Sequence, residues 1–416
     1  MSRFPMVFSI PGVIFDEQVF SDMAIQHRSG IGIIVLLLLS GWYNTLCASD
    51  SLQVHQLLNR IAAQQVRTSG KFAAGMFPSY REYDKHRNHF KDDDNAFYTG
   101  LVVFTLRQLR PHLPPADQLL CDTIISRAAP VYARFRNTKG RNTYNFWQTD
   151  PPTVFPNGGW LNWMNKTHTL PDDMDDTAIV LMAMDAPDSV VQQVHALMQG
   201  YTNNGKKKVK NTLKAYKHIA AYSTWFGKRM PIDFDVCVLS NVLYMVQQRQ
   251  LAFTAADSAS LQLIQEVVKS REYMLHPSFV APHYSRSSII LYHLSRLMQL
   301  RTLPLLEPYK QQLIADAQLI FAQSDNLVDK IILSTALMRW GVQPPVTAMQ
   351  TDVPVTALVE NSDFVFFIAN MTSMLPNPFK QWMGSTGLGR FFYYAPAYNN
   401  VLLLEYLVWR KRVNSE

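Results

Sequence analysis

The sequence has few cysteines, little strand-like alternation and no recognisable linker. Cys47, Cys121 and Cys237 stand far apart without paired spacing, which excludes a disulfide framework and a cysteine-rich zinc site. No stretch rich in Gly, Pro or Ser divides the chain after its first fifty residues, so we expect one domain over residues 50–416. With 416 residues, of which 48% are hydrophobic, the chain can bury a large core.

Positive charge exceeds negative charge only modestly, with a formal net charge of +7. Part of this excess lies in the lysine-rich residues 206–217, which have no interleaved aromatic motif of the kind that binds nucleic acid. We interpret the segment as a solvated loop and helix face, with contact to a membrane surface or an anionic substrate group as the alternative. Nucleic acid is therefore not an expected partner.

Residues 23–49 have the pattern of a secretory signal peptide. A short basic segment around Arg28 precedes the apolar run Ile31–Leu39, and small residues follow near Ala48. The run is short for a membrane-spanning helix, and an uncleaved anchor is the alternative. On this interpretation residues 1–22 precede a misassigned start, and we expect an exported protein of the periplasm or cell envelope.

Six segments share one design, in which a polar or acidic start is followed by a helix that is apolar on every side. They are residues 92–109, 172–184, 233–246, 284–298, 325–340 and 397–408. Helices of this kind are buried. Amphipathic stretches lie between them, at residues 116–134, 189–198, 256–274, 306–322 and 355–371. The alternation predicts an all-α fold, a single (α/α)6 toroid, with the polar starts gathered at one end around a cavity mouth.

The most distinctive stretch is residues 171–178, which read Pro-Asp-Asp-Met-Asp-Asp-Thr-Ala. At helical spacing its carboxylates share one patch at the start of a helix, and donors, cations or bound protons must relieve their repulsion. We therefore expect a raised pKa for one of these acids. The alternative is that the aspartates only cap the helix and complement its dipole.

Residues 157–184 resemble the repeat of class II terpene cyclases, the squalene-hopene and copalyl diphosphate type, in which a Gly-Gly-aromatic turn leads to Pro-Asp and then to Asp-x-Asp-Asp-Thr-Ala. The family motif falls on Asp173, Asp175 and Asp176. The resemblance implies that Asp175 protonates an alkene or epoxide of an isoprenoid, supported by Asp173 and Asp176. It implies no metal and no organic cofactor. Because members of this type use two toroids, a partner chain could supply the second one.

We expect substrate-binding residues around the same cavity. Aromatic faces attract a carbocation, and acids at other helix starts would face the same space. The candidates are Trp147, Trp160, Trp163, Trp225, Tyr394, Asp94, Asp233 and Asp235. The resemblance also implies a histidine beside the acid, for which the candidates are His168, His283 and His293.

Three other functions fit parts of the pattern. An exported carbohydrate-active hydrolase or lyase on the same helical scaffold could use two carboxyl groups from different helix starts across a sugar. An aspartate box of Asp172, Asp173 and Asp176 could bind magnesium and a diphosphate, although the sequence lacks a second box of the Asn-Asp-x-x-Ser type. A non-catalytic binding module of the cell envelope is the third alternative.

Overall fold

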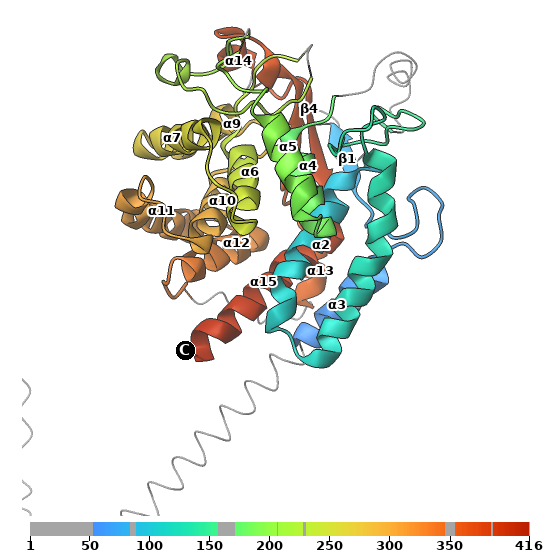
Figure 1. Ribbon diagram of the computed structural model, residues 1–416. Helices are drawn as coiled ribbons and strands as arrows, with labels where there is room; N and C mark the ends of the chain where they lie inside the picture. Colours follow the sequence, from blue (N-terminus) through green and yellow to red (C-terminus); the bar gives the residue numbers. More distant parts are fainter. Residues whose placement is uncertain are drawn as a thin grey trace, which may run out of the picture. The chain divides into compact units, whose positions relative to one another are not determined.

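Six long, buried helices form the centre of the protein, for which we describe a computed structural model (Figure 1). They are α2 (Ala96–Leu109), α4 (Met174–Met184), α6 (Val236–Gln248), α10 (Ser287–Leu300), α12 (Leu327–Arg339) and α15 (Pro396–Ser415). Each coincides with one of the six apolar segments, so these helix predictions are confirmed. The structure describes residues 53–83, 89–156, 171–205, 207–227, 230–345, 354–383 and 386–415.

Polar residues start these helices because their side chains satisfy backbone amides that have no partner within the helix. The side chain of Asn95 accepts from the amide of Tyr98, and Asp235 accepts from that of Cys237 at 2.8 Å. Asn326 caps α12 in the same way. The capping interpretation of the polar starts therefore holds at several helices, beside any further function.

The central helices contact one another in a closed cycle. α2 packs against α4, α4 against α6, α6 against α10, α10 against α12, α12 against α15, and α15 returns to α2. Each helix thus has apolar neighbours on both sides, which explains why its sequence is apolar all round. Figure 1 shows α2, α4, α6, α10 and α12 arranged in this order around the molecule.

Further helices cover the central set or connect its members. The longer ones are residues 53–64, α3 (Pro115–Ala128), α5 (Asp188–Met198), α7 (Ala255–Lys269) and α11 (Lys310–Gln323). Short helices are α8 (Glu272–Leu275), α9 (Pro277–Val280), α13 (Val355–Glu360) and α14 (Phe379–Met383). The 3-10 helices are η1 (Arg110–His112), η2 (Ala129–Phe135), η4 (Lys214–Tyr216), η5 (Glu307–Tyr309) and η6 (Met371–Met374). α3 packs on α2, α7 on α6, and α11 on α10 and α12, so an outer layer covers much of the cycle.

A small antiparallel sheet, which the all-α prediction did not include, adds to the mainly helical fold. Its strands are β1 (Tyr80–Tyr83), β2 (Lys91–Asp92), β3 (Phe367–Asn370) and β4 (Arg390–Tyr394), in the order β2-β1-β4-β3. The predicted helix over residues 355–371 is wrong beyond Glu360, where α13 ends. The chain that follows forms β3 instead, in which Phe367 pairs with Tyr393 of β4.

The described residues belong to one unit that begins at Gln53. The predicted signal peptide over residues 23–49 and the segment 1–22 lie outside the described residues. Within the described ranges, no helix has both the length and the apolar character that crossing a bilayer requires.

Gly100 marks the closest contact between α2 and α4. A Cβ atom added there would lie 2.9 Å from Cγ2 of Ile179. We expect Gly100→Val to lower the free energy of unfolding by about 1–3 kcal/mol, because the extra methyl groups overpack the contact. Urea denaturation measures this loss. The matched control is Gly200→Val, whose Cβ would meet its nearest atom at 3.5 Å, and an equal loss in both variants would contradict the close packing.

Candidate functional site

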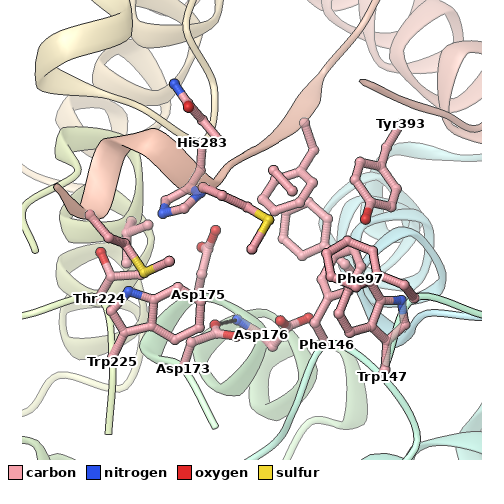
Figure 2. Close-up of a pocket in the computed structure, with 17 residues that line it drawn as sticks. Phe97, Phe146, Trp147, Asp173, Asp175, Asp176, Thr224, Trp225, His283 and Tyr393 are labelled. Carbon is pink, nitrogen blue, oxygen red and sulfur yellow. Dashed lines mark hydrogen bonds between the residues drawn. The ribbon is translucent and has the colours of Figure 1, made fainter. Parts of the chain in front are cut away.

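A hollow with many aromatic side chains lies where the N-terminal ends of α2, α4 and α6 meet β3 and β4 (Figure 2). We call it the acid cavity; its empty volume, including the space at its mouth, is about 730 Å³. Its lining residues are Phe97, Phe146, Trp147, Phe155, Asp173, Asp175, Asp176, Thr224, Trp225, Val238, His283, Phe367, Ala369, Asn370, Met371, Met374 and Tyr393. A concave, mainly apolar lining with a few polar groups is typical of a small-molecule site.

The loop before α4 is held by backbone contacts on both sides. The amide of Asp173 donates to the carbonyl of Tyr144 at 3.3 Å, and the amide of Met174 donates to that of Thr224 at 2.8 Å. The side chain of Asp173 then caps α4 by accepting from the amide of Asp176 at 2.7 Å. These contacts fix the start of α4, so Asp175 and Asp176 in its first turn reach the cavity.

Asp172 has a different environment from the three acids of the cavity. Its Oδ2 accepts from Nδ2 of Asn137 at 2.6 Å and from Oγ1 of Thr143. Asp172 does not line the acid cavity in the described structure. The aspartate box of Asp172, Asp173 and Asp176 is therefore not assembled on one cavity wall.

Asp173 and Asp176 form a carboxyl pair. Burial raises the pKa of Asp173 to about 7, while its side-chain hydrogen bond with Asp176 acts in the opposite direction. Burial and then the charge of Asp173 raise the pKa of Asp176 well above its ordinary value. Two neighbouring carboxylates that are shielded from water repel each other strongly. The pair of Asp173 and Asp176 therefore retains one proton near neutral pH.

Asp175 is buried between two hydrogen-bond donors. Its Oδ1 accepts from Nδ2 of Asn241 at 2.6 Å, and its Oδ2 accepts from the hydroxyl of Tyr284. Burial raises the pKa of Asp175, and the bonds from Tyr284 and Asn241 oppose that rise. Asn241 is oriented in turn by Arg296, whose Nη2 donates to its Oδ1.

His283 lies on the cavity wall with two acids behind it. Its Nε2 is 3.5 Å from Oδ2 of Asp233, and its backbone amide donates to Oδ2 of Asp235 at 2.9 Å. Burial opposes a charged imidazole most strongly, but Asp233, Asp235 and Asp175 together raise the pKa of His283. Burial also raises the pKa of Asp235 to about 6. His283 therefore holds its proton more tightly than an ordinary imidazole.

Aromatic rings form the wall that faces these acids. The rings of Phe146 and Phe367 stack with centroids 5.2 Å apart, and the ring of Phe97 lies 4.8 Å from that of Phe367. The indole N–H of Trp147 donates to Asp93 at 2.9 Å, which fixes its ring. Figure 2 shows Phe97, Phe146, Trp147 and Tyr393 together on the side of the cavity away from Trp225. Such faces attract a cation through their quadrupoles.

The structure brings part of the predicted site together. Asp173, Asp175, Asp176, Trp147 and Trp225 all line the acid cavity, and of the candidate histidines His283 does so. Trp160, Trp163 and His168 lie outside the described residues.

Other predicted site residues are placed elsewhere. Asp94 does not line the cavity; burial raises its pKa to about 6, and its Oδ2 lies 3.5 Å from Nη2 of Arg134. Asp233 and Asp235 stand behind His283. Tyr394 packs edge-on against Phe90, whereas its neighbour in β4, Tyr393, lines the cavity.

Sequence reasoning missed the residues that surround Asp175. Asn241 and Arg296 lie inside helices that are mainly apolar, and the prediction considered only the polar starts of these helices. A polar residue in an otherwise apolar buried helix is a usable signal, because it must find a partner there. Phe97, Phe146 and Phe367 had no comparable signal, since aromatic residues are common in any core.

Comparison of the chain with protein-family models, with curated proteins and with solved structures found no match. Within the described ranges, no group of three or more His, Cys, Asp or Glu side chains is arranged to hold a metal ion.

The raised pKa values predict how stability depends on pH. The carboxyl of Asp173 binds its proton more tightly in the folded protein, where its pKa is about 7, than in the unfolded chain, where an aspartate has a pKa of about 4. The protein therefore loses stability as the pH rises through this window. We expect Asp176→Asn to make the free energy of unfolding fall less steeply over this window, because one of the two repelling carboxyls is gone. Chemical denaturation at several pH values measures the slope.

Asp122→Asn is the matched control for this measurement. Asp122 is half-exposed, and its hydrogen bond to Arg110 lowers its pKa, so its contribution changes only below the window. The same change of slope in both variants, or no change in Asp176→Asn, would contradict the shared proton.

Proposed function

We propose that the helical cycle is a single (α/α)6 toroid and that the acid cavity is the active site of a class II terpene-cyclase-like enzyme. The closed sequence of contacts from α2 to α15 and back, with α3, α7 and α11 outside it, supports the toroid. The observation that carries the function is the burial of Asp173, Asp175 and Asp176 in one wall of a hollow whose lining includes seven Phe, Trp and Tyr residues.

Asp175 is the proton donor in this proposal. An acid that protonates an alkene must keep its proton at neutral pH and still give it up readily. Burial works toward the first need, because it raises the pKa of Asp175. The donors Tyr284 and Asn241 meet the second, because they stabilise the carboxylate that remains after transfer.

The reaction begins when the O–H bond of Asp175 breaks and its proton bonds to one carbon of a terminal alkene, or to an epoxide oxygen. The alkene π electrons form the new C–H bond and leave a cation on the neighbouring carbon. The next double bond of the isoprenoid attacks that cation and closes a ring, and loss of a proton or capture of water ends the series. Phe97, Phe146 and Trp147 are positioned to stabilise the cationic intermediates and exclude water.

Two alternatives are less well supported. A glycosidase needs two carboxyl groups on opposite sides of a sugar in a wet groove, whereas Asp173 and Asp176 bond to each other on one apolar wall. If the aspartates only capped α4, the cavity would have no catalytic group. The substrate is an isoprenoid or similar hydrophobic molecule, while export, contact with a membrane surface and a partner chain with a second toroid remain predictions from the sequence.

Replacement of the proton donor tests the proposal. The purified protein should convert at least one of squalene, oxidosqualene and geranylgeranyl diphosphate to a cyclic product that gas chromatography and mass spectrometry identify. We expect Asp175→Asn to lower that turnover by about 10²–10⁴-fold, the usual contribution of a general acid, with unchanged helical circular dichroism.

Asp122→Asn should keep full activity, because its carboxyl bonds to Arg110 away from the cavity. Retained turnover in Asp175→Asn would remove the assignment. Hydrolysis of a polysaccharide by a protein that leaves all three lipids unchanged would favour the carbohydrate-active alternative.

Removing one donor from Asp175 gives a graded test. We expect Tyr284→Phe to lower turnover by roughly 10–100-fold, because the carboxylate left after proton transfer loses a hydrogen bond worth about 1.5–3 kcal/mol. Steady-state kinetics should show the loss in kcat. Tyr273→Phe is the matched control, since Tyr273 donates to Asp316 and does not line the cavity. Equal losses in the two variants would point to a general effect on folding.

A further inference from the structure

A second hollow lies at the other ends of the central helices. The C-terminal halves of α2, α6, α10, α12 and α15 line it, whereas the acid cavity lies at N-terminal ends. We call it the distal pocket; its empty volume, including the space at its mouth, is about 570 Å³. Its polar lining includes Thr105, Gln108, Arg296, Gln299, Arg339 and Arg412.

Arg296 is a buried cation in this pocket with unused hydrogen-bonding capacity. Its side chain lines the pocket and the residue is only 4% exposed. Nη2 donates to Asn241, but Nη1 has no hydrogen-bond partner in the described part of the protein. Among the described carboxylates, none lies within ion-pair distance of Arg296. A buried charge without a directly bound carboxylate is costly, which favours an anion at this position.

The one carboxylate of the distal pocket is already engaged. Oε1 of Glu405 accepts from Nη2 of Arg339, and Oε2 accepts from the hydroxyl of Tyr292 at 2.6 Å. Arg412 lies beside His112, with Nη1 3.2 Å from the imidazole Nε2. The lining thus contains three arginines and one glutamate, which leaves a net positive charge.

Thr105 supplies a second unused polar atom. Its hydroxyl is buried in the lining and has no partner among the residues that the structure describes. Arg339 has partners within the protein, since it bonds to Glu405 and its Nη1 lies 3.4 Å from the carbonyl of Tyr292. Nη1 of Arg296 and the hydroxyl of Thr105 have no such partner among the described residues.

We propose that the distal pocket binds a small oxyanion, a carboxylate or a phosphate group, between the guanidinium of Arg296 and the hydroxyl of Thr105. Planar N–H donors of arginine suit such oxygens. Phe104, Tyr244 and Tyr292 surround the Arg296 guanidinium at 5.1 to 5.6 Å, and their low polarity strengthens the contact with an anion. The observations that support this site do not depend on whether the acid cavity performs a cyclisation, although Arg296 also bonds to Asn241 beside Asp175.

Ligand binding to the full-length chain tests the site. Isothermal titration with inorganic phosphate and with acetate, against sodium chloride at matched ionic strength, should show saturable binding of at least one oxyanion. We expect Thr105→Val to weaken that binding about fivefold and Arg296→Met to weaken it more than tenfold. Thr105→Val should fold as well as the unmodified protein, because it removes a hydroxyl that has no partner.

Thr335→Val is the matched control. Thr335 is a buried threonine of α12 whose hydroxyl donates to the carbonyl of Ile331, and it does not line the distal pocket. Its variant should bind the oxyanion normally. If a short-chain phosphatidic acid binds more tightly than phosphate, the ligand is a lipid headgroup. If the two bind with equal affinity, the ligand is a dissolved anion. No binding beyond the chloride control, or equal binding by Thr105→Val and the unmodified protein, would overturn the proposal.

Discussion

Burial of three carboxyl groups with no lysine or arginine bonded to them is the constraint on which this structure depends. Asp173 caps α4, Asp175 and Asp176 lie in its first turn, and within the described ranges no lysine or arginine forms an ion pair with them. Water cannot compensate their charge either, since each is almost completely buried. The structure relieves the charge in three ways: a shared proton for the pair, the donors Tyr284 and Asn241 for Asp175, and the positive charge of His283, which opposes the rise in the pKa of Asp173 and Asp175.

Segments far apart in the sequence close the space around these acids. β1 lies near the start of the described chain and β4 near its end, yet Arg81 pairs with Tyr393 in the sheet. β3 then places Phe367 against Phe97 of α2 and Phe146 of the following loop. The aromatic wall therefore forms only when the C-terminal third of the chain has packed onto the first helices, which ties the site to the complete fold.

Sequence patterns predicted the helices well and the site in part. The six apolar runs were readable because a helix that is apolar all round must be buried, and the motif at Asp173 stands at the start of one of them. The strand at Phe367 was not readable, since a short aromatic run fits a strand or a buried helix equally. The residues around Asp175 were missed for another reason: Asn241 meets it only through the packing of α6 against α4, and Arg296 meets Asn241 only through the packing of α10 against α6.

That packing also links the two ends of the molecule. Arg296 donates to Asn241, and Asn241 donates to Asp175, so one guanidinium in the distal pocket is two hydrogen bonds from the candidate acid. A positive charge near Asn241 polarises the amide and strengthens its bond to the carboxylate form of Asp175. An anion that neutralised Arg296 would weaken this effect and make Asp175 a weaker acid. Arg296, Asn241 and Asp175 thus form one chain of hydrogen bonds between the apolar helices. Their placement follows from the need of a buried carboxyl group for hydrogen-bond donors.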